Sequence, residues 1–264
     1  MLFVRSVFFH ILFYLNFFAH AAMTPIALLT PSHVAWLIGS NWMTRSIDVW
    51  RFSTGSKIEV RGLENIPEGG FIIASKHQST WETLGLAKIF GRITYIMKRE
   101  LMNIPIFGWF CAKAKMIPID RGSGSKVIKP MTEKAREAVN EGRNIVIFME
   151  GTRVPAGGML PYKVGVARLY GELQCPIVPI ALNTGLFWPR NSFWRYSGKV
   201  IVEILPPIMP GLRPKEALAR LEKEVEDATN RLLIETAQSP EAPETVDAAL
   251  ERLKARGVEV TAPV

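Results

Sequence analysis

The sequence predicts an α/β fold, in which a layered domain with a central sheet of about seven strands follows an apolar helical membrane anchor. Two observations support this prediction. Short apolar runs rich in β-branched residues alternate with helical stretches from residue 57 onward, and the N-terminal stretch is almost free of charge. A chain of 264 residues fits one α/β domain with an appendage better than two independent domains. We therefore expect one active site.

The first 45 residues are the strongest compositional feature. No Asp, Glu, Lys or Arg occurs between Arg5 and Arg45. The apolar segment 3–22 is about long enough to span a bilayer, which needs ~20 apolar residues, whereas the segment 25–43 contains two prolines. Basic residues flank both ends of this region, which predicts that both ends stay in the cytoplasm. Residues 1–45 are thus predicted to form a membrane-associated helical hairpin that spans or dips into the bilayer. A secretory signal peptide is the alternative.

Seven runs in the rest of the chain have the character of strands. They are residues 57–60, 71–75, 93–97, 115–119, 144–149, 176–182 and 199–205. Several are almost continuously apolar, which is typical of strands covered on both faces. Helical stretches lie between them, at 125–142 and 164–173 among others.

The C-terminal part is helical and mixed in charge. A helical stretch begins after Pro214, a linker covers 238–247, and a short helix follows at 248–257. We therefore divide the rest of the chain into an α/β domain at residues 46–212 and a C-terminal helical extension at residues 213–264.

The charge and the metal-binding residue types limit the function classes. A formal net charge of +8 favours an anionic partner, such as nucleic acid, an acidic membrane surface or a phosphorylated substrate. Cys111 and Cys175 occur in apolar contexts without metal-ligand spacing, so neither a disulfide framework nor a zinc site is expected. His77 is the single histidine outside the apolar N-terminal stretch, so we expect no metal site.

The segment "HQSTWE" follows the second predicted strand, at the edge where open α/β sheets bind ligands. If His77 lies in the turn and Glu82 in the first turn of a helix, the carboxylate can reach the imidazole. The same residues form a capping box, in which Ser79 caps the helix and Glu82 bonds back to the Ser79 amide. The pattern alone leaves both interpretations open, and the absence of another histidine in the domain favours catalysis.

Charged residues end two further strands. They are Asp120 and Arg121 after one strand, and Glu150, Gly151, Thr152 and Arg153 after another. A small glycine and a hydroxyl before an arginine suit a phosphate, because amides and a guanidinium fork can bind its oxygens.

Four segments together resemble the conserved blocks of a known family. "HQSTWE", "MIPIDR", "FMEGTR" and "CPIVPIA" have the order and rough spacing of the four blocks of the glycerolipid acyltransferases, over about residues 57–210. The chain is most similar to the lysophosphatidic acid acyltransferases. It departs from the usual pattern in having Glu82 in place of Asp and Met149 in place of Pro. Neither change removes a reactive group.

The resemblance implies transfer of an acyl chain from acyl-CoA or acyl-ACP to the free sn-2 hydroxyl of lysophosphatidic acid, which gives phosphatidic acid. It implies no cofactor beyond this co-substrate, and an α/β domain that faces the cytoplasm at the cell inner membrane. His77 would be the general base and Glu82 its orienting acid. Substrate binding is expected from Arg153 first and Arg121 next, from Glu150, Gly151 and Thr152 around them, and from Lys98 and Lys163 as helpers.

Two other functions remain open at this point. The acceptor could be glycerol 3-phosphate or a lyso-aminolipid, or the chain could be a non-catalytic protein that binds lipid at a membrane surface. Residues 185–199 interleave aromatic and basic side chains, which suits a lipid headgroup interface but also single-stranded nucleic acid. The apolar N-terminus favours the membrane, so anionic lipid is the expected partner and nucleic acid is not.

Overall fold

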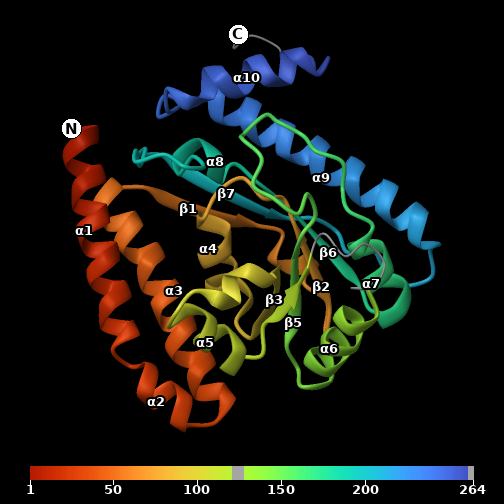
Figure 1. Ribbon diagram of the computed structural model, residues 1–264. Coiled ribbons are helices and arrows are strands. Elements are labelled where there is room, and N and C mark those ends of the chain that lie inside the picture. Colours follow the sequence, from red (N-terminus) through yellow and green to blue (C-terminus); the bar gives the residue numbers. More distant parts are fainter. Residues whose placement is uncertain (121–127, 261–264) are drawn as a thin grey trace.

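The computed structural model describes residues 1–120 and 128–260, and a seven-stranded sheet lies at its centre between two layers of helices (Figure 1). The strand order is β1-β7-β6-β2-β5-β3-β4. The strands are β1 (Lys57–Arg61), β2 (Ile72–Ser75), β3 (Ile93–Lys98), β4 (Ile117–Ile119), β5 (Asn144–Phe148), β6 (Ile177–Leu182) and β7 (Lys199–Ile204). All seven predicted strands are therefore confirmed.

Helices fill most of the connections between these strands. They are α1 (Leu2–Ala21), α2 (Thr24–Leu29), α3 (Ser32–Thr54), η1 (Leu63–Asn65), α4 (Trp81–Phe90), η2 (Arg99–Asn103), α5 (Phe107–Lys113), α6 (Ile128–Asn140), α7 (Gly165–Leu173), α8 (Thr184–Phe187), α9 (Pro214–Ala237) and α10 (Thr245–Ala255). The helix predicted at 125–142 is α6, and the start of that range lies outside the described residues. The last helix begins three residues earlier than predicted, at Thr245.

The sheet is parallel except where β6 pairs with β7. Strand β2 lies between β5 and β6, with Ile72 opposite Ile145 on one side and Ile177 on the other. Strands β2, β5 and β3 run in the same direction, so their carboxyl ends meet at one edge. The segments that follow Ser75 and Phe148 therefore begin side by side.

Both faces of the sheet are buried, as the apolar runs predict. Successive residues of a strand point to opposite faces. Thus Ile73 packs with Trp50 of α3 and Leu84 of α4 on one face, while Ile72 packs with Leu221 of α9 on the other. The α3–α4 layer and the α6–α7–α9 layer cover the two faces (Figure 1).

Helices α1 and α3 form an antiparallel pair joined by α2 (Figure 1). The amide of Asn16 donates to the Trp42 carbonyl at 3.1 Å and to the Ser46 hydroxyl at 2.9 Å, which joins the two helices. Helix α3 continues without a break across residue 45, where the anchor was predicted to end. Its second half belongs to the domain core, because Trp50 is fully buried there.

Helix α1 buries few of its apolar side chains. Within the described residues it is the one helix long and apolar enough to cross a membrane. Its exposed large side chains are Phe3, Val4, Phe8, Ile11, Tyr14, Leu15 and Phe18. The other side of α1 packs on the domain, where Phe9 contacts Trp188 edge to face at 4.9 Å between ring centroids. The helix therefore presents one apolar face outward and is joined to the domain by the other.

Candidate active site

The turn after β2 brings His77 and Glu82 together. His77 lies between the strand and α4, and Glu82 lies in the first turn of α4. The Nδ1 nitrogen of His77 is 2.8 Å from Oε1 of Glu82. The carboxylate is fully buried, whereas 14% of the His77 side chain is exposed. The predicted contact between the two side chains is thus present in the structure.

The Glu82 carboxylate also binds the turn that leads into α4, although α4 has no side-chain cap at its N-cap residue, Thr80. Its Oε1 accepts hydrogen bonds from the amides of Gln78 at 2.7 Å and Ser79 at 2.6 Å. Its Oε2 accepts the Thr184 hydroxyl of α8 at 2.8 Å. The bond back to the Ser79 amide and the imidazole contact, considered above as alternatives, therefore both involve the Glu82 carboxylate.

This hydrogen bonding determines which nitrogen of His77 can act as a base. A carboxylate that accepts bonds from amides and a hydroxyl has no proton to donate, so Nδ1 of His77 is the donor. Nε2 then carries the free lone pair. Ser79 is not available as a nucleophile, because its hydroxyl donates to the Trp188 carbonyl at 2.6 Å and accepts the Trp81 amide at 3.0 Å.

His77 lies at an apolar cavity of about 320 Å³. Its ring stacks on Phe148 at the end of β5, with 3.8 Å between centroids. The cavity wall combines α1, α3, α4, β3 and α5, and its lining includes Trp36, Gly39, Trp42, Tyr95, Phe107 and Cys111. Burial raises the pKa of the Cys111 thiol to about 12. A cavity with this apolar lining is suited to a hydrocarbon chain, and the His77 ring lies in its wall.

Arg153 lies at the rim of this cavity. Its guanidinium donates to the Thr80 hydroxyl at 2.9 Å, and Thr80 lines the cavity together with His77. The adjacent Val154 amide donates to the His77 carbonyl at 2.7 Å, which joins the loop after β5 to the turn after β2. The structure thus brings a cation to a residue that lines the same cavity as His77.

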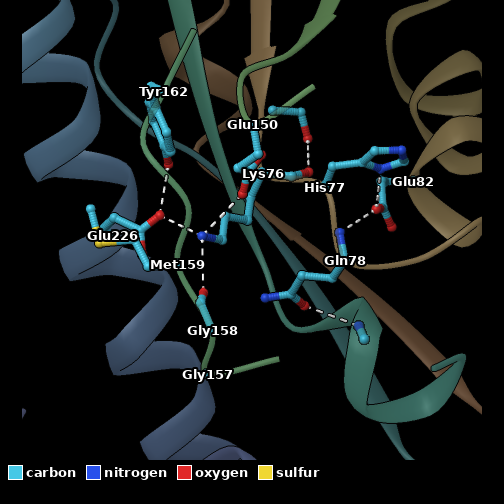
Figure 2. A network of polar contacts seen from close by, with 12 residues as sticks. Lys76, His77, Gln78, Glu82, Glu150, Gly157, Gly158, Met159, Tyr162 and Glu226 are labelled. Atoms are coloured by element: carbon cyan, nitrogen blue, oxygen red, sulfur yellow. Dashed lines mark hydrogen bonds and ion pairs between the residues drawn. The ribbon is translucent and has the colours of Figure 1, made fainter. Parts of the chain in front are cut away.

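Glu150 lies away from the cavity. Its side chain is fully buried, and its carboxylate is 3.0 Å from Nζ of Lys76 (Figure 2). Burial raises the pKa of Glu150 to about 7. Glu150 does not line the cavity at His77, so its position favours a structural role over the predicted contact with substrate.

The other residues of the loop are closer to the surface. Gly151 has a φ of 70°, a left-handed conformation that favours glycine, and Thr152 beside it is half-buried. Met149, which occupies the place of the family's proline, packs in the core cluster between the sheet and the α6–α7–α9 layer. It therefore contributes packing where the proline would shape a turn.

The predicted helper lysines lie in different places. Lys98 ends β3, lines the cavity and pairs with Glu100 at 3.0 Å. Lys163 is exposed, and its amide donates to the Met149 carbonyl at 2.9 Å. Arg121, the second predicted phosphate ligand, lies outside the described residues.

The aromatic and basic segment at 185–199 divides into two parts. Trp188 and Arg195 are buried, with the guanidinium over the indole at 4.5 Å, and burial lowers the pKa of Arg195 to about 10. Phe193 and Trp194 are exposed and lie beside Phe3 of α1, at 6.1 and 6.3 Å between centroids. These two side chains extend the apolar surface of the first helix.

Three residues in and around the site were not predicted from the sequence. They are Lys76, Thr80 and Thr184. A charged residue in an apolar strand end, directly before the candidate base, was a local signal for Lys76. Thr184 carried no such signal, because its contact with Glu82 spans 102 positions of sequence.

Similarity to known proteins agrees with this geometry. Residues 57–183 match a family model described as Acyltransferase. A 1-acyl-sn-glycerol-3-phosphate acyltransferase of Pseudomonas aeruginosa is 36% identical over 225 residues, which are 84% of this chain and 88% of that protein. The human 1-acyl-sn-glycerol-3-phosphate acyltransferase alpha is 34% identical over 173 residues, or 64% of this chain and 61% of that protein.

A solved structure has the same fold. The crystal structure of the 1-acyl-sn-glycerophosphate acyltransferase of Thermotoga maritima superimposes with a TM-score of 0.67 at 21% identity. The match covers 88% of this chain and 98% of that one.

Proposed function

The chain belongs to the acyltransferase family, and from this premise we propose that it transfers an acyl chain to the free sn-2 hydroxyl of 1-acyl-sn-glycerol 3-phosphate, which gives phosphatidic acid. The names of its relatives support this acceptor. The observation that carries the mechanism is the His77–Glu82 pair, which lies at an apolar cavity with Arg153 at its rim.

The acceptor hydroxyl needs a base, because an alcohol is a poor nucleophile at neutral pH. Nε2 of His77 takes the hydroxyl proton as the oxygen attacks the thioester carbonyl. Glu82 holds the other ring nitrogen as the donor and stabilises the imidazolium that forms. The substrate thus supplies the hydroxyl that a serine supplies in a hydrolase, and no acyl-enzyme intermediate is required.

The tetrahedral intermediate then collapses to products. The carbon–sulfur bond breaks, the electron pair leaves with sulfur, and the imidazolium of His77 returns the proton to the thiolate. The oxyanion needs a donor, and the amides in the turn after His77 are the candidates. The amides of Gln78, Ser79 and Trp81 are already bonded to side chains. This leaves the amide of Thr80 as the candidate donor in the turn.

The two substrates occupy different parts of the site. We assign the phosphate of the acceptor to Arg153, because a guanidinium binds phosphate oxygens in a bidentate manner. Lys98 lies at the cavity and adds a second positive charge. An acyl chain occupies the apolar cavity, and the donor thioester, acyl-CoA or acyl-ACP, brings its carbonyl to His77.

The protein associates with a membrane through its N-terminal region. We propose that this is the inner membrane and that the α/β domain faces the cytoplasm. The apolar surface formed by α1, Phe193 and Trp194 supports a contact with the acyl region of a leaflet. Anionic lipid is the matching surface, since the chain has a net charge of +8.

A panel of acceptors tests this function. The purified protein is mixed with a labelled acyl thioester and with lysophosphatidate, glycerol 3-phosphate or a lyso-aminolipid, and the lipid product is identified by mass. We expect phosphatidate from lysophosphatidate and little product from the other acceptors. Preferred acylation of another acceptor would overturn the assignment.

A further inference from the structure

Lys76, the residue directly before His77, has a fully buried side chain. Its ammonium group pairs with Glu150 at 3.0 Å and with Glu226 of α9, and it donates to the Gly158 carbonyl at 3.3 Å (Figure 2). A buried ammonium is costly unless anions and hydrogen-bond acceptors surround it. The surroundings of Lys76 provide both.

The C-terminal helices take part in this cluster through Glu226. One oxygen of Glu226 accepts the Tyr162 hydroxyl at 2.9 Å, and the other accepts the Arg256 guanidinium at 3.2 Å. Arg256, just after α10, also donates to the Gly157 carbonyl at 3.0 Å. Helix α9, the end of α10 and the 157–162 loop therefore converge on the same ammonium group.

The loop after β5 joins the cluster through Glu150. Both carboxylate oxygens of Glu150 are buried and have no hydrogen-bond partner of good geometry among the described residues. The ammonium group of Lys76 is the cation that pairs with this carboxylate. Arg153 follows three residues later, and the amide of Val154 bonds the His77 carbonyl. The loop after β5 is therefore held at Glu150 by Lys76 and at Val154 by the turn that carries His77.

The backbone of Lys76 connects the buried ion cluster to His77. Its amide donates to the Ile180 carbonyl of β6 at 3.1 Å, and its carbonyl accepts the Ser75 hydroxyl at 2.8 Å. The main chain is thus held by the sheet and the side chain by α9, and the next residue is the candidate base. Lys76 does not line the cavity, so it does not touch the substrates.

We propose that Lys76 is a positioning residue, whose buried ion cluster with Glu150 and Glu226 makes the C-terminal helices part of the acyltransferase site. The inference rests on the proposed role of His77 as base. The helical extension then orients the catalytic turn from the face of the sheet opposite α3 and α4. Loss of the cluster should lower turnover and leave acceptor affinity almost unchanged.

The test is a double-mutant cycle of Lys76→Met and Glu226→Gln, with kcat and KM for lysophosphatidate measured well below each variant's Tm. Methionine keeps most of the length of lysine without its charge, and glutamine keeps an acceptor for Tyr162. The matched control is Asp227→Asn, the next residue on α9, whose side chain is 60% exposed.

We expect Lys76→Met to lower kcat at least tenfold with KM within about twofold, and Asp227→Asn to change neither. The double variant should be no slower than Lys76→Met alone, because both changes remove one interaction. Three results would each overturn the proposal: additive effects of the two substitutions on kcat, an unchanged kcat in Lys76→Met, or a rise in KM without a fall in kcat. If Lys76→Met does not fold, Glu226→Gln decides: a several-fold fall in kcat supports the proposal, and wild-type turnover overturns it.

His77→Ala, assayed in parallel, separates this inference from the proposed mechanism. Retained acyl transfer in that variant would remove His77 as the base, whatever the cluster does. If His77→Ala is inactive while Lys76→Met and Glu226→Gln keep full turnover, the mechanism stands and the positioning role of Lys76 fails.

Discussion

Glu82 holds His77 with the same carboxylate oxygen that holds the turn before α4, since Oε1 lies 2.8 Å from the imidazole Nδ1 and also accepts the amides of Gln78 and Ser79. The orientation of the His77 imidazole and the backbone of residues 78 and 79 therefore depend on one another. Thr184 holds the second oxygen, which leaves the carboxylate little freedom to rotate.

Substitution of Glu82 and of His77 should distinguish the effect of the carboxylate charge from the effect of its hydrogen bonds. Glu82→Gln keeps an acceptor for the amides and for Nδ1 of His77 but removes the charge that stabilises the imidazolium. We expect a folded protein whose kcat falls on the order of 10–10²-fold, and a loss of 10²–10⁴-fold in His77→Ala. Steady-state acyl transfer and circular dichroism provide the measurement. Wild-type turnover in either variant would contradict the mechanism.

Arg153→Ala should chiefly raise the KM for lysophosphatidate. A charge-assisted hydrogen bond contributes about 1.5–3 kcal/mol, so KM should rise roughly 10–10²-fold. Arg168→Ala, which removes an exposed cation on α7, is the control and should leave KM unchanged. The assignment of the phosphate to Arg153 fails if the two variants have the same KM.

Gly39→Leu should shorten the acyl chain that the enzyme prefers. Gly39 lines the cavity, and a Cβ added there meets no atom within 4 Å, so the new side chain can occupy the cavity without a clash. Each methylene excluded costs ~0.8 kcal/mol, or roughly fourfold in kcat/KM for a long donor. A series of acyl thioesters measures the preference, and Gly39→Ala should change it little. An unaltered profile in Gly39→Leu would mean that the chain lies elsewhere.

Glu150→Gln should make stability less dependent on pH. The pKa of Glu150 is raised by burial from 4.5 to about 7, so the folded state holds a proton that the unfolded state has lost between these values. The contribution of Glu150 to stability therefore decreases as pH rises through this range. Relative to the wild type, the variant should gain up to about 3 kcal/mol between pH 4.5 and 7. Urea unfolding in one detergent at several pH values measures this, and parallel curves for the two proteins would contradict it.

Phe193→Ser with Trp194→Ser should weaken binding to lipid vesicles. Both side chains are exposed beside Phe3, and burial of a large apolar side chain contributes about 1.5–3 kcal/mol, so partitioning should fall roughly tenfold or more. Leu212→Ser, which removes an exposed apolar side chain just before α9, serves as the control. Equal sedimentation of both variants with anionic vesicles would exclude this surface from membrane contact.

Local patterns predicted most of the architecture. The seven strands follow from short apolar runs, because the strand period and burial on both faces are encoded within a few residues. The predicted end of the anchor at residue 45 falls inside α3. Charged residues appear there because the second half of the helix has a solvent-exposed side, while Trp50 faces the core.

The interleaved segment at 185–199 shows where pattern alone is insufficient. Composition alone does not show which of its aromatic and basic residues are buried and which are exposed. Packing decides this. Trp188 and Arg195 are buried beneath α1, while Phe193 and Trp194 remain at the surface. Which side of a loop faces the core depends on the helix that covers it, and that helix is distant in sequence.

The sequence by itself determined the strands and placed His77 and Glu82 five positions apart between a strand and a helix, because each of these features depends on residues within a few positions of one another. The tertiary structure alone decided that Glu150 turns inward to Lys76, and that Glu226, 150 positions after Lys76, completes the cluster. A buried charge is stable only where chain packing brings its counter-charge. No local pattern specifies that partner.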